Sequence, residues 1–172
     1  MHFEPSSVMT EKPSPEEVVR WQRRLAGQAN NRAWSLSEQA SRSAAEDEEM
    51  LNAAHAAMYF WSIVGNANNQ AHAAQLLAHT YAMVKQPKPA SHYLDKCLPM
   101  LAGESAKPWE RAMAHAVAAN VASAGGNTQD HTRHYQEAMR LTAALENVEE
   151  RAIIEATLRI LPVPTSVRTS VD

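Results

Sequence analysis

The sequence predicts an all-α protein, and three observations support that prediction. Alanine, the residue with the highest helix propensity, occurs 31 times in 172 residues. The β-branched and aromatic residues that strands prefer are scarce, with only four isoleucines and two phenylalanines. No segment alternates apolar and polar residues at the period of two that marks a half-buried strand. We therefore expect about seven helices, arranged as antiparallel hairpins.

The first two predicted helices begin with the same N-terminal signal. In "SPEE", Ser14 is placed to cap a helix that starts at proline, and Glu17 can reach back to the capping residue. Ser43 opens "SAAE" in the same way. Apolar residues then recur every three or four positions, which extends the first helix to about residue 41 and the second to the Gly-Asn pair at 65–66.

Proline and glycine separate the later helices. "KQPKP" interrupts one helix and opens the next, and Pro99 is expected to bend or end the fourth helix. A third helix is expected to begin near Asn68 or Asn69 and end at Lys85. The remaining predicted helices cover about 89–99, 108–124, 128–145 and 147–161.

The predicted organisation is one helical domain over residues 14–160. A chain of 172 residues fits a single domain and can bury about 70% of the surface that its unfolded form exposes. Residues 1–13 are polar and contain two prolines, and residues 161–172 are polar with spaced prolines. We expect these two segments to form a flexible N-terminal arm and a flexible C-terminal tail.

Charge and composition argue against several classes of function. The net charge of −3 gives no electrostatic reason to expect nucleic-acid binding. No apolar window reaches the roughly 18 residues of a membrane span, and the N-terminus lacks the pattern of a signal peptide. Cys97 is the only cysteine, which excludes an intrachain disulfide and a thiolate metal cluster. These features favour a cytoplasmic location.

Small residues mark a predicted helix crossing within "LLAHTYAMVKQPKPASHYLDKC". Ala78 and Ala90 would let two helices approach closely, while Tyr81 and Leu94 fill the space beside them. This pattern resembles the tetratricopeptide repeat, or TPR, in which two small residues cross beside an aromatic one. The resemblance implies a short right-handed superhelix, and it covers roughly residues 15–160.

The spacing of the apolar residues supports the resemblance in part. Ala57, Trp61 and Val64 precede their equivalents in the next hairpin by 33 residues, close to the TPR period of about 34. Further along the chain the period stretches to about 40, and His131 stands where a small residue is expected. The pattern is also similar to that of small bacterial helical-repeat proteins of unassigned function.

The resemblance implies a non-catalytic interaction module, either scaffold or adaptor, that binds a protein or peptide and needs no cofactor. In TPR-like arrays the first helix of each pair lines a concave groove. The residues expected to face that groove are His72, Gln75, His79 and His115. Imidazoles and an amide would suit the backbone of an extended peptide. The alternative is that these residues are simply solvated on the polar side of an amphipathic helix.

A homodimer is a second expectation, since a short array leaves apolar surface at its ends. Trp34 lies off the main apolar stripe of its helix, and Trp109 lies near the start of the fifth helix. We consider both residues candidates for an oligomer patch.

The rival hypothesis is a small metal-dependent enzyme. "HTRH" places His131 and His134 three residues apart with Glu137 one turn further on, which is a workable ligand set for zinc or iron. Packing or capping by these histidines is the alternative interpretation. Cys97 falls on an apolar stripe, which favours a buried thiol over a nucleophile. We find no catalytic constellation in the sequence.

Overall fold

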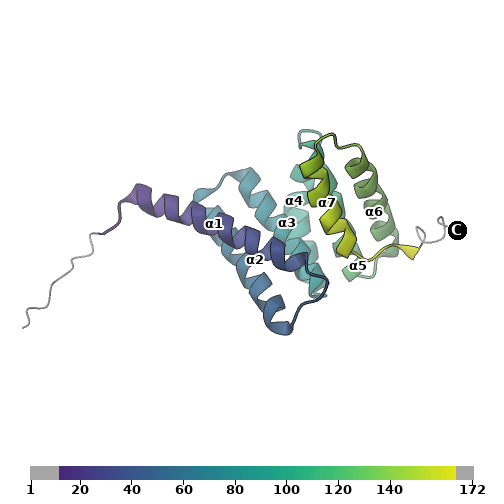
Figure 1. Cartoon of the computed structure of the whole chain (residues 1–172), viewed down its shortest axis with the longest axis horizontal. Helices are drawn as coiled ribbons and strands as arrows, with labels where there is room; N and C mark the ends of the chain where they lie inside the picture. Colours follow the sequence, from purple (N-terminus) through teal and green to yellow (C-terminus); the bar gives the residue numbers. More distant parts are fainter. Residues whose placement is uncertain (1–11, 166–172) are drawn as a thin grey trace, which may run out of the picture.

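The computed structural model describes residues 12–165, and within that part the chain forms seven α-helices and no strand. The prediction of an all-α fold is therefore confirmed. The expected arm and tail fall largely outside the described residues. The helices are α1 Pro15–Ser37, α2 Ala44–Val64, α3 Ala67–Met83, α4 Pro87–Leu101, α5 Pro108–Ala124, α6 Thr128–Ala143 and α7 Val148–Ile160 (Figure 1).

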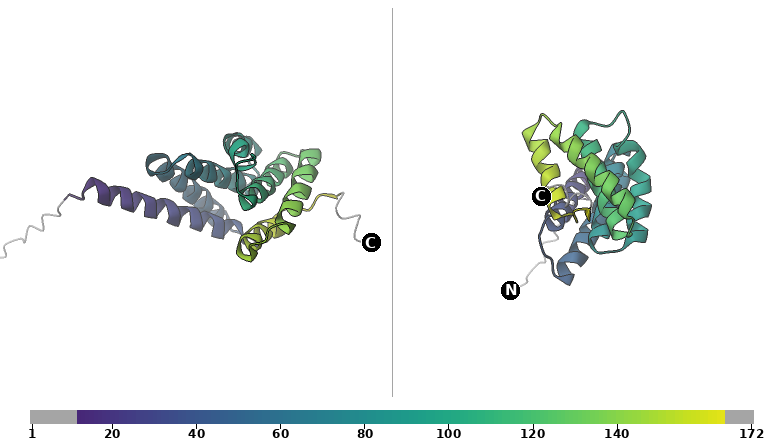
Figure 2. Two further views of the ribbon diagram at one scale, coloured as in Figure 1. Left: turned by 90° about the horizontal axis from the view of Figure 1, so that it is seen from above. Right: turned by 90° about the vertical axis from the view of Figure 1, so that its right-hand side faces the viewer.

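The first six helices form three hairpins, α1/α2, α3/α4 and α5/α6, whose members make the most extensive contacts in the molecule. Helix α3 connects the hairpins, because it also packs against α1, α2 and α5. Helix α7 follows the third hairpin and packs on α5 and α6. The views in Figure 2 show the N-terminal half of α1 extending beyond the other helices.

Capping side chains explain where the first three helices begin. Glu17 accepts from the Ser14 N–H at 2.8 Å, and Glu46 accepts from the Ser43 N–H at the same distance, so both predicted capping boxes are present. Asn66 caps α3 in the same reciprocal way. Helix α3 therefore starts at Ala67, slightly earlier than expected.

Several helix ends differ from the sequence prediction. Helix α4 starts at Pro87 and continues past Pro99 to Leu101. Pro99 lies in the last turn, and it lacks the N–H that would bond to the carbonyl oxygen of Asp95. Helices α1, α3 and α6 each end two to four residues before the expected position.

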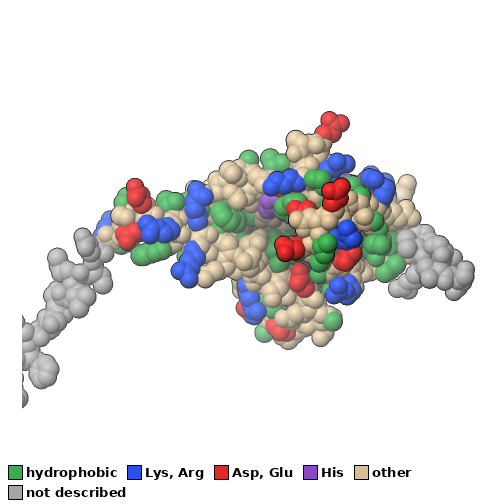
Figure 3. All heavy atoms as spheres, turned by 45° about the horizontal axis from the view of Figure 1, so that its top comes forward, with side chains coloured by type: hydrophobic (Ala, Val, Ile, Leu, Met, Phe, Trp, Pro, Cys, Tyr) green, Lys and Arg blue, Asp and Glu red, His purple; other side chains and the backbone are tan. Residues whose placement is uncertain are grey.

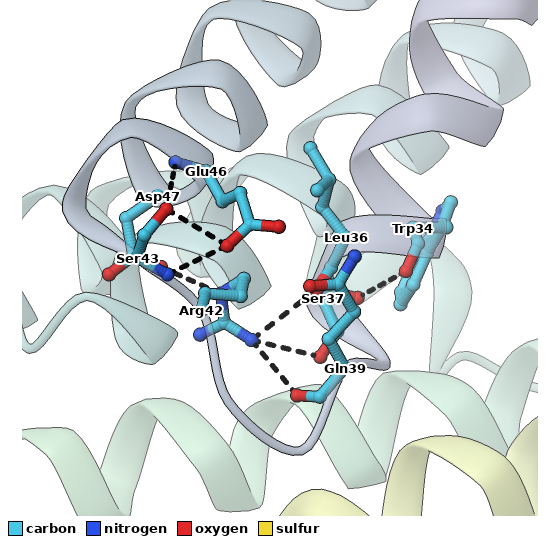
Figure 4. Close-up of polar contacts among 8 residues, drawn as sticks. All are labelled: Trp34, Leu36, Ser37, Gln39, Arg42, Ser43, Glu46 and Asp47. Atoms are coloured by element: carbon cyan, nitrogen blue, oxygen red, sulfur yellow. Dashed lines mark hydrogen bonds and ion pairs between the residues drawn. The ribbon is translucent and has the colours of Figure 1, made fainter.

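Arg42 explains why α1 ends early (Figure 4). Its Nη1 donates to the carbonyl oxygens of Leu36, Ser37 and Gln39 at 3.3 to 3.4 Å, at the C-terminal end of the helix. Its Nε donates to Asp47 at 2.6 Å, in the first turn of α2. The guanidinium thus donates hydrogen bonds to carbonyl oxygens at the end of α1, which have no further helical turn to bond to. Through Asp47 it also fixes the turn between the two helices.

The small-residue crossing lies in the core. Ala78 of α3 and Ala90 of α4 are both 0% exposed and belong to one core cluster, with Tyr81 and Leu94 packed against it. Gly65 between α2 and α3 is equally constrained, since an added Cβ would lie 2.6 Å from the Trp61 carbonyl oxygen. Close backbone approach therefore sets the path of the chain at both positions.

Candidate functional site

Two of the predicted groove residues of α3, His72 and His79, contact residues of α5. Nε2 of His72 lies 2.9 Å from Oε1 of Glu110, whose side chain is buried, and the imidazole stacks on Trp109 at 5.4 Å between ring centroids. Burial raises the pKa of Glu110, but hydrogen bonds from the Lys107 N–H and from His72 outweigh it and leave the pKa below its ordinary value. His72 therefore joins α3 to α5.

His79 forms a second link between the same helices. It is 0% exposed, stacks on Trp34 at 5.1 Å, and accepts at Nδ1 from Asn120 Nδ2 at 3.1 Å. Burial, with a smaller contribution from Arg42, lowers the pKa of His79 to about 3. The neutral ring consequently carries its proton on Nε2. That Nε2 atom and Nε2 of Gln75 are buried without a hydrogen-bond partner among the described residues.

The burial of Gln75 and His79 contradicts the expectation that they face a peptide-binding groove. Gln75 is 2% exposed and His79 is fully buried, so neither side chain lies on an open surface that a peptide could reach. The physical reason is that α1 and α5 cover this face of α3, through Trp34 on one side and Asn120 on the other. His72 is only half-buried, and it is already paired with Glu110.

The pairings show that α3 and α5 run in the same direction. His72 meets a residue 38 positions later, and His79 meets one 41 positions later, so both helices advance together. This spacing agrees with the period of about 40 that separates the apolar stripes of the two helices in the sequence. Glu110 and Asn120 were not predicted as partners of these histidines. The period of about 40 residues is the feature of the sequence that could have pointed to them.

His115 of α5 pairs with His134 of α6, with their Nδ1 atoms 2.9 Å apart. Nη2 of Arg133 lies 3.2 Å from Nε2 of His134, and because arginine can only donate, that nitrogen must accept. A neutral His134 therefore donates from Nδ1 to His115, whose own proton is on Nε2. Burial, followed by the charges of His115 and Arg133, lowers the pKa of His134 to about 4.

An open groove of about 870 Å³ lies beside His115 of this pair. We call it the α6 groove. Burial also lowers the pKa of His115, and nearby Glu137 opposes that shift. The groove is thus bordered by a neutral imidazole and by polar and charged side chains. Its lining consists of His115, Thr128, Gln129, Thr132, Arg133, Gln136, Glu137 and Arg140.

The proposed metal ligands do not converge. His131 Nε2 donates to the Pro162 carbonyl oxygen at 2.9 Å, which ties α6 to the segment after α7. His134 is bonded to His115, and Glu137 accepts two hydrogen bonds from Arg140. Within residues 12–165, no three His, Cys, Asp or Glu side chains are placed to hold one metal ion. The alternative interpretation of His131, His134 and Glu137 as one metal site is therefore wrong for the described residues.

The two tryptophans expected on an oligomer patch pack within their own chain. Trp34 is partly buried against two core clusters and stacks on His79. Trp109 is partly buried and stacks on His72. Each indole ring thus uses one of its faces within its own chain, against a histidine of α3.

His55 has a partner that the sequence did not reveal. Its Nε2 lies 2.7 Å from the Tyr81 hydroxyl, and Tyr81 stacks on Tyr93 at 5.9 Å between ring centroids. Residues of α2, α3 and α4 thus meet in one aromatic cluster. Lys96 lies over the Tyr93 ring at 5.2 Å. These contacts join the first two hairpins.

No model of a protein family matches the chain, and neither the curated proteins nor the solved structures contain a match to it. None of the described helices combines the length and the apolar character that crossing a membrane requires. The geometry of the site is therefore the basis of the functional argument that follows.

Proposed function

We propose that this chain is a non-catalytic, TPR-like interaction module that binds a short extended protein segment in the α6 groove. Three hairpins connected through α3, with α3 and α5 running in the same direction, support the repeat-like architecture. Architecture alone is weak support for function, so the proposal depends on the groove. We also propose a cytoplasmic location, because the single cysteine is a buried free thiol.

The observation that carries the proposal is the row of hydrogen-bonding side chains along α6. Gln129 and Gln136 lie seven residues apart on one face of the helix, with Thr132 between them. The amides of the two glutamines can meet both the N–H and the C=O groups of an extended backbone. From Thr128 to Arg140 the helix rises about 18 Å, which matches about five or six residues of extended peptide.

The charges of the groove favour a segment that carries carboxylates. Arg133 binds Asp130 at 2.8 Å and Arg140 binds Glu137 at 2.6 Å, and the two arginine side chains are 66% and 63% exposed. Such exposed pairs contribute little to stability, so an incoming carboxylate can exchange for the internal one. Arginine is also the side chain best suited to bidentate carboxylate binding.

Two observations support a binding role rather than a catalytic one. The lone pair of His115 accepts from His134, and the lone pair of His134 accepts from Arg133, so neither is directed toward a substrate in the groove. Cys97 is 1% exposed, and burial raises the pKa of its thiol to about 12. A thiol in that environment lacks the thiolate that nucleophilic attack needs.

Fluorescence anisotropy with labelled hexapeptides tests the proposal. A peptide with two glutamates separated by two or three residues should bind at least fivefold more tightly than its lysine counterpart, and added salt should weaken it. The double variant Arg133→Gln/Arg140→Gln should lose that preference. The control Arg23→Gln/Arg159→Gln removes two exposed arginines elsewhere and should bind normally. Equal affinity for the acidic and basic peptides would refute the proposal.

A further inference from the structure

The first half of α1 carries apolar side chains that the other described residues, 12–165, leave exposed. Trp21 is 54% exposed and Leu25 is 45% exposed, and Val18 is partly exposed one turn earlier. This half of the helix extends beyond the remaining helices, and hydrophobic side chains lie on it among charged ones (Figure 3). We call Val18, Trp21 and Leu25 the outer stripe.

The outer stripe continues, beyond the other helices, one side of α1 that joins the core. Leu36, which is 0% exposed, lies 18 residues after Val18 and therefore on the same side of the helix, whereas the buried Ala26 and Ala33 lie to one side of it. The residues of the outer stripe recur at intervals of three and four, so they share one side of the helix. Towards the C-terminus the same side reaches Arg32, which binds Glu49 of α2 at 2.6 Å. The available surface is thus confined to the first three turns.

We propose that the outer stripe binds the outer stripe of a second copy of this chain, with the two α1 helices antiparallel. A twofold axis near Trp21 would place Val18 opposite Leu25 of the second copy and the two indole rings against each other. Apolar residues at intervals of three and four are the pattern by which helices pair along a seam. The same surface on both copies is what a twofold dimer requires.

Charge complementarity argues for a second copy rather than another occupant. Glu17 and Arg24 are seven residues apart and flank the outer stripe on the same side. In an antiparallel pair, Glu17 of one copy lies level with Arg24 of the other, and the symmetry creates two such pairs. Oε2 of Glu17 caps α1, which leaves Oε1 available, and within residues 12–165 Arg24 has no acidic partner.

The pairings also agree in register. For each pair, the midpoint of the two residue numbers lies within half a residue of Trp21, which corresponds to less than about 1 Å along the helix. The three pairs are Val18 with Leu25, Trp21 with Trp21, and Glu17 with Arg24. The interface would involve only three turns of each helix and would fall at the small end of stable protein interfaces. We therefore expect a reversible dimer that forms as the concentration rises.

Sedimentation equilibrium of the full chain over a wide concentration range tests the dimer. The average mass should rise from 19.0 kDa toward twice that value. Trp21→Ser should weaken the association at least tenfold without changing the far-UV circular dichroism, because the indole does not support the core. A mass that stays at 19.0 kDa up to about millimolar concentration would overturn the proposal.

A charge exchange tests the antiparallel pairing itself. Arg24→Glu places like charges opposite each other and should weaken the dimer about tenfold, while Arg23→Glu makes the same change away from the stripe and should have little effect. A Glu17→Arg chain should also associate poorly with itself. Mixing the Arg24→Glu and Glu17→Arg chains should restore association, since both cross-pairs become opposite in charge.

Controls separate this proposal from its competitors. Ser14→Ala breaks the α1 capping box without altering the flanking charges, so a loss of association equal to that of Glu17→Arg would mean that helix fraying, rather than charge, is responsible. Failure of the mixed chains to associate would refute antiparallel pairing.

A membrane is the competing occupant of the outer stripe. If vesicles of anionic lipid bind wild type but not Trp21→Ser, and no dimer forms in solution, the stripe binds membranes instead. Peptide binding in the α6 groove is measured separately and is independent of each of these results.

Discussion

Asn120 Nδ2 donates to Nδ1 of His79 across 3.1 Å, so α5 holds a neutral imidazole of α3 in the centre of the molecule. Asn120 also donates to the His79 carbonyl oxygen at 3.3 Å. A protonated His79 would place a charge where its Nε2 atom has no partner. The repeat-like contact between α3 and α5 is therefore sensitive to acid.

We expect the free energy of unfolding to decrease as the pH falls from about 6.5 to about 3. The pKa of His79 is about 3 in the folded chain and has its ordinary value of 6.5 in the unfolded chain. Between these values the unfolded state binds one more proton, so stability is lost on acidification by about 1.4 kcal/mol per pH unit. His134, with a pKa of about 4, acts in the same direction over a narrower range.

His79→Phe tests this assignment. Phenylalanine keeps a ring on Trp34 and removes the buried N–H that lacks a partner, while Asn120 retains the carbonyl oxygen. Stability at pH 7 should change by less than about 1 kcal/mol. Urea unfolding at pH 6, 5 and 4 should show a dependence of the unfolding free energy on pH that is lower by about 1.3 kcal/mol per pH unit than that of wild type. An unchanged slope would show that other groups cause the acid sensitivity.

Removal of the Arg42 guanidinium should destabilise the first hairpin. Its side chain is 9% exposed and bonds three carbonyl oxygens and Asp47, so Arg42→Met should cost about 2 to 3 kcal/mol. Arg32→Met is the matched control. It breaks an ion pair whose two side chains are 49% and 48% exposed, and it should cost less than about 1 kcal/mol. Equal losses in the two variants would contradict the role of Arg42 in the turn.

Enlargement of the α3/α4 crossing should be costly. Ala78 is 0% exposed inside a packed cluster, so Ala78→Leu should reduce the free energy of unfolding by about 1 to 3 kcal/mol, or shift the hairpin. Ala45→Leu adds the same atoms at an exposed position of α2 and should change stability by less than about 0.5 kcal/mol. Thermal unfolding of both variants compares them directly. Tolerance of leucine at both positions would show that the crossing does not need a small residue.

Cys97 should be inert in the folded protein. The thiol is 1% exposed, and burial raises its pKa to about 12. At pH 8 we expect negligible reaction with Ellman's reagent until denaturant is added. A Ser91→Cys variant supplies an exposed thiol on the same helix as a positive control. Rapid labelling of native wild type would mean that α4 opens readily.

Local signals in the sequence were sufficient for the fold class and for several helix starts. Ser14 and Ser43 act within one turn of chain, so "SPEE" and "SAAE" are readable without tertiary information. The end of α1 could not be predicted from the sequence, because it depends on contacts of the Arg42 side chain with the carbonyl oxygens of Leu36 and Gln39. Pro99 shows the same limit, since its effect depends on how close the helix end lies.

The candidate site was predicted less well than the fold. The spacing of His72, Gln75 and His79 correctly placed them on one side of α3, but it carried no information on which element covers that side. Burial of His79 depends on Trp34 from α1, more than forty residues away in the chain. The pairing of His115 with His134 likewise requires the α5/α6 hairpin to be closed. Contacts of this kind become visible only once the helices are positioned.

The connections between the hairpins have a mechanical consequence. Helices α1 and α2 contact the rest of the described chain chiefly through α3. Tension applied between the two ends would therefore reach the first pair mainly across its contacts with α3. Those contacts would have to break before the pair could separate from the rest of the described chain.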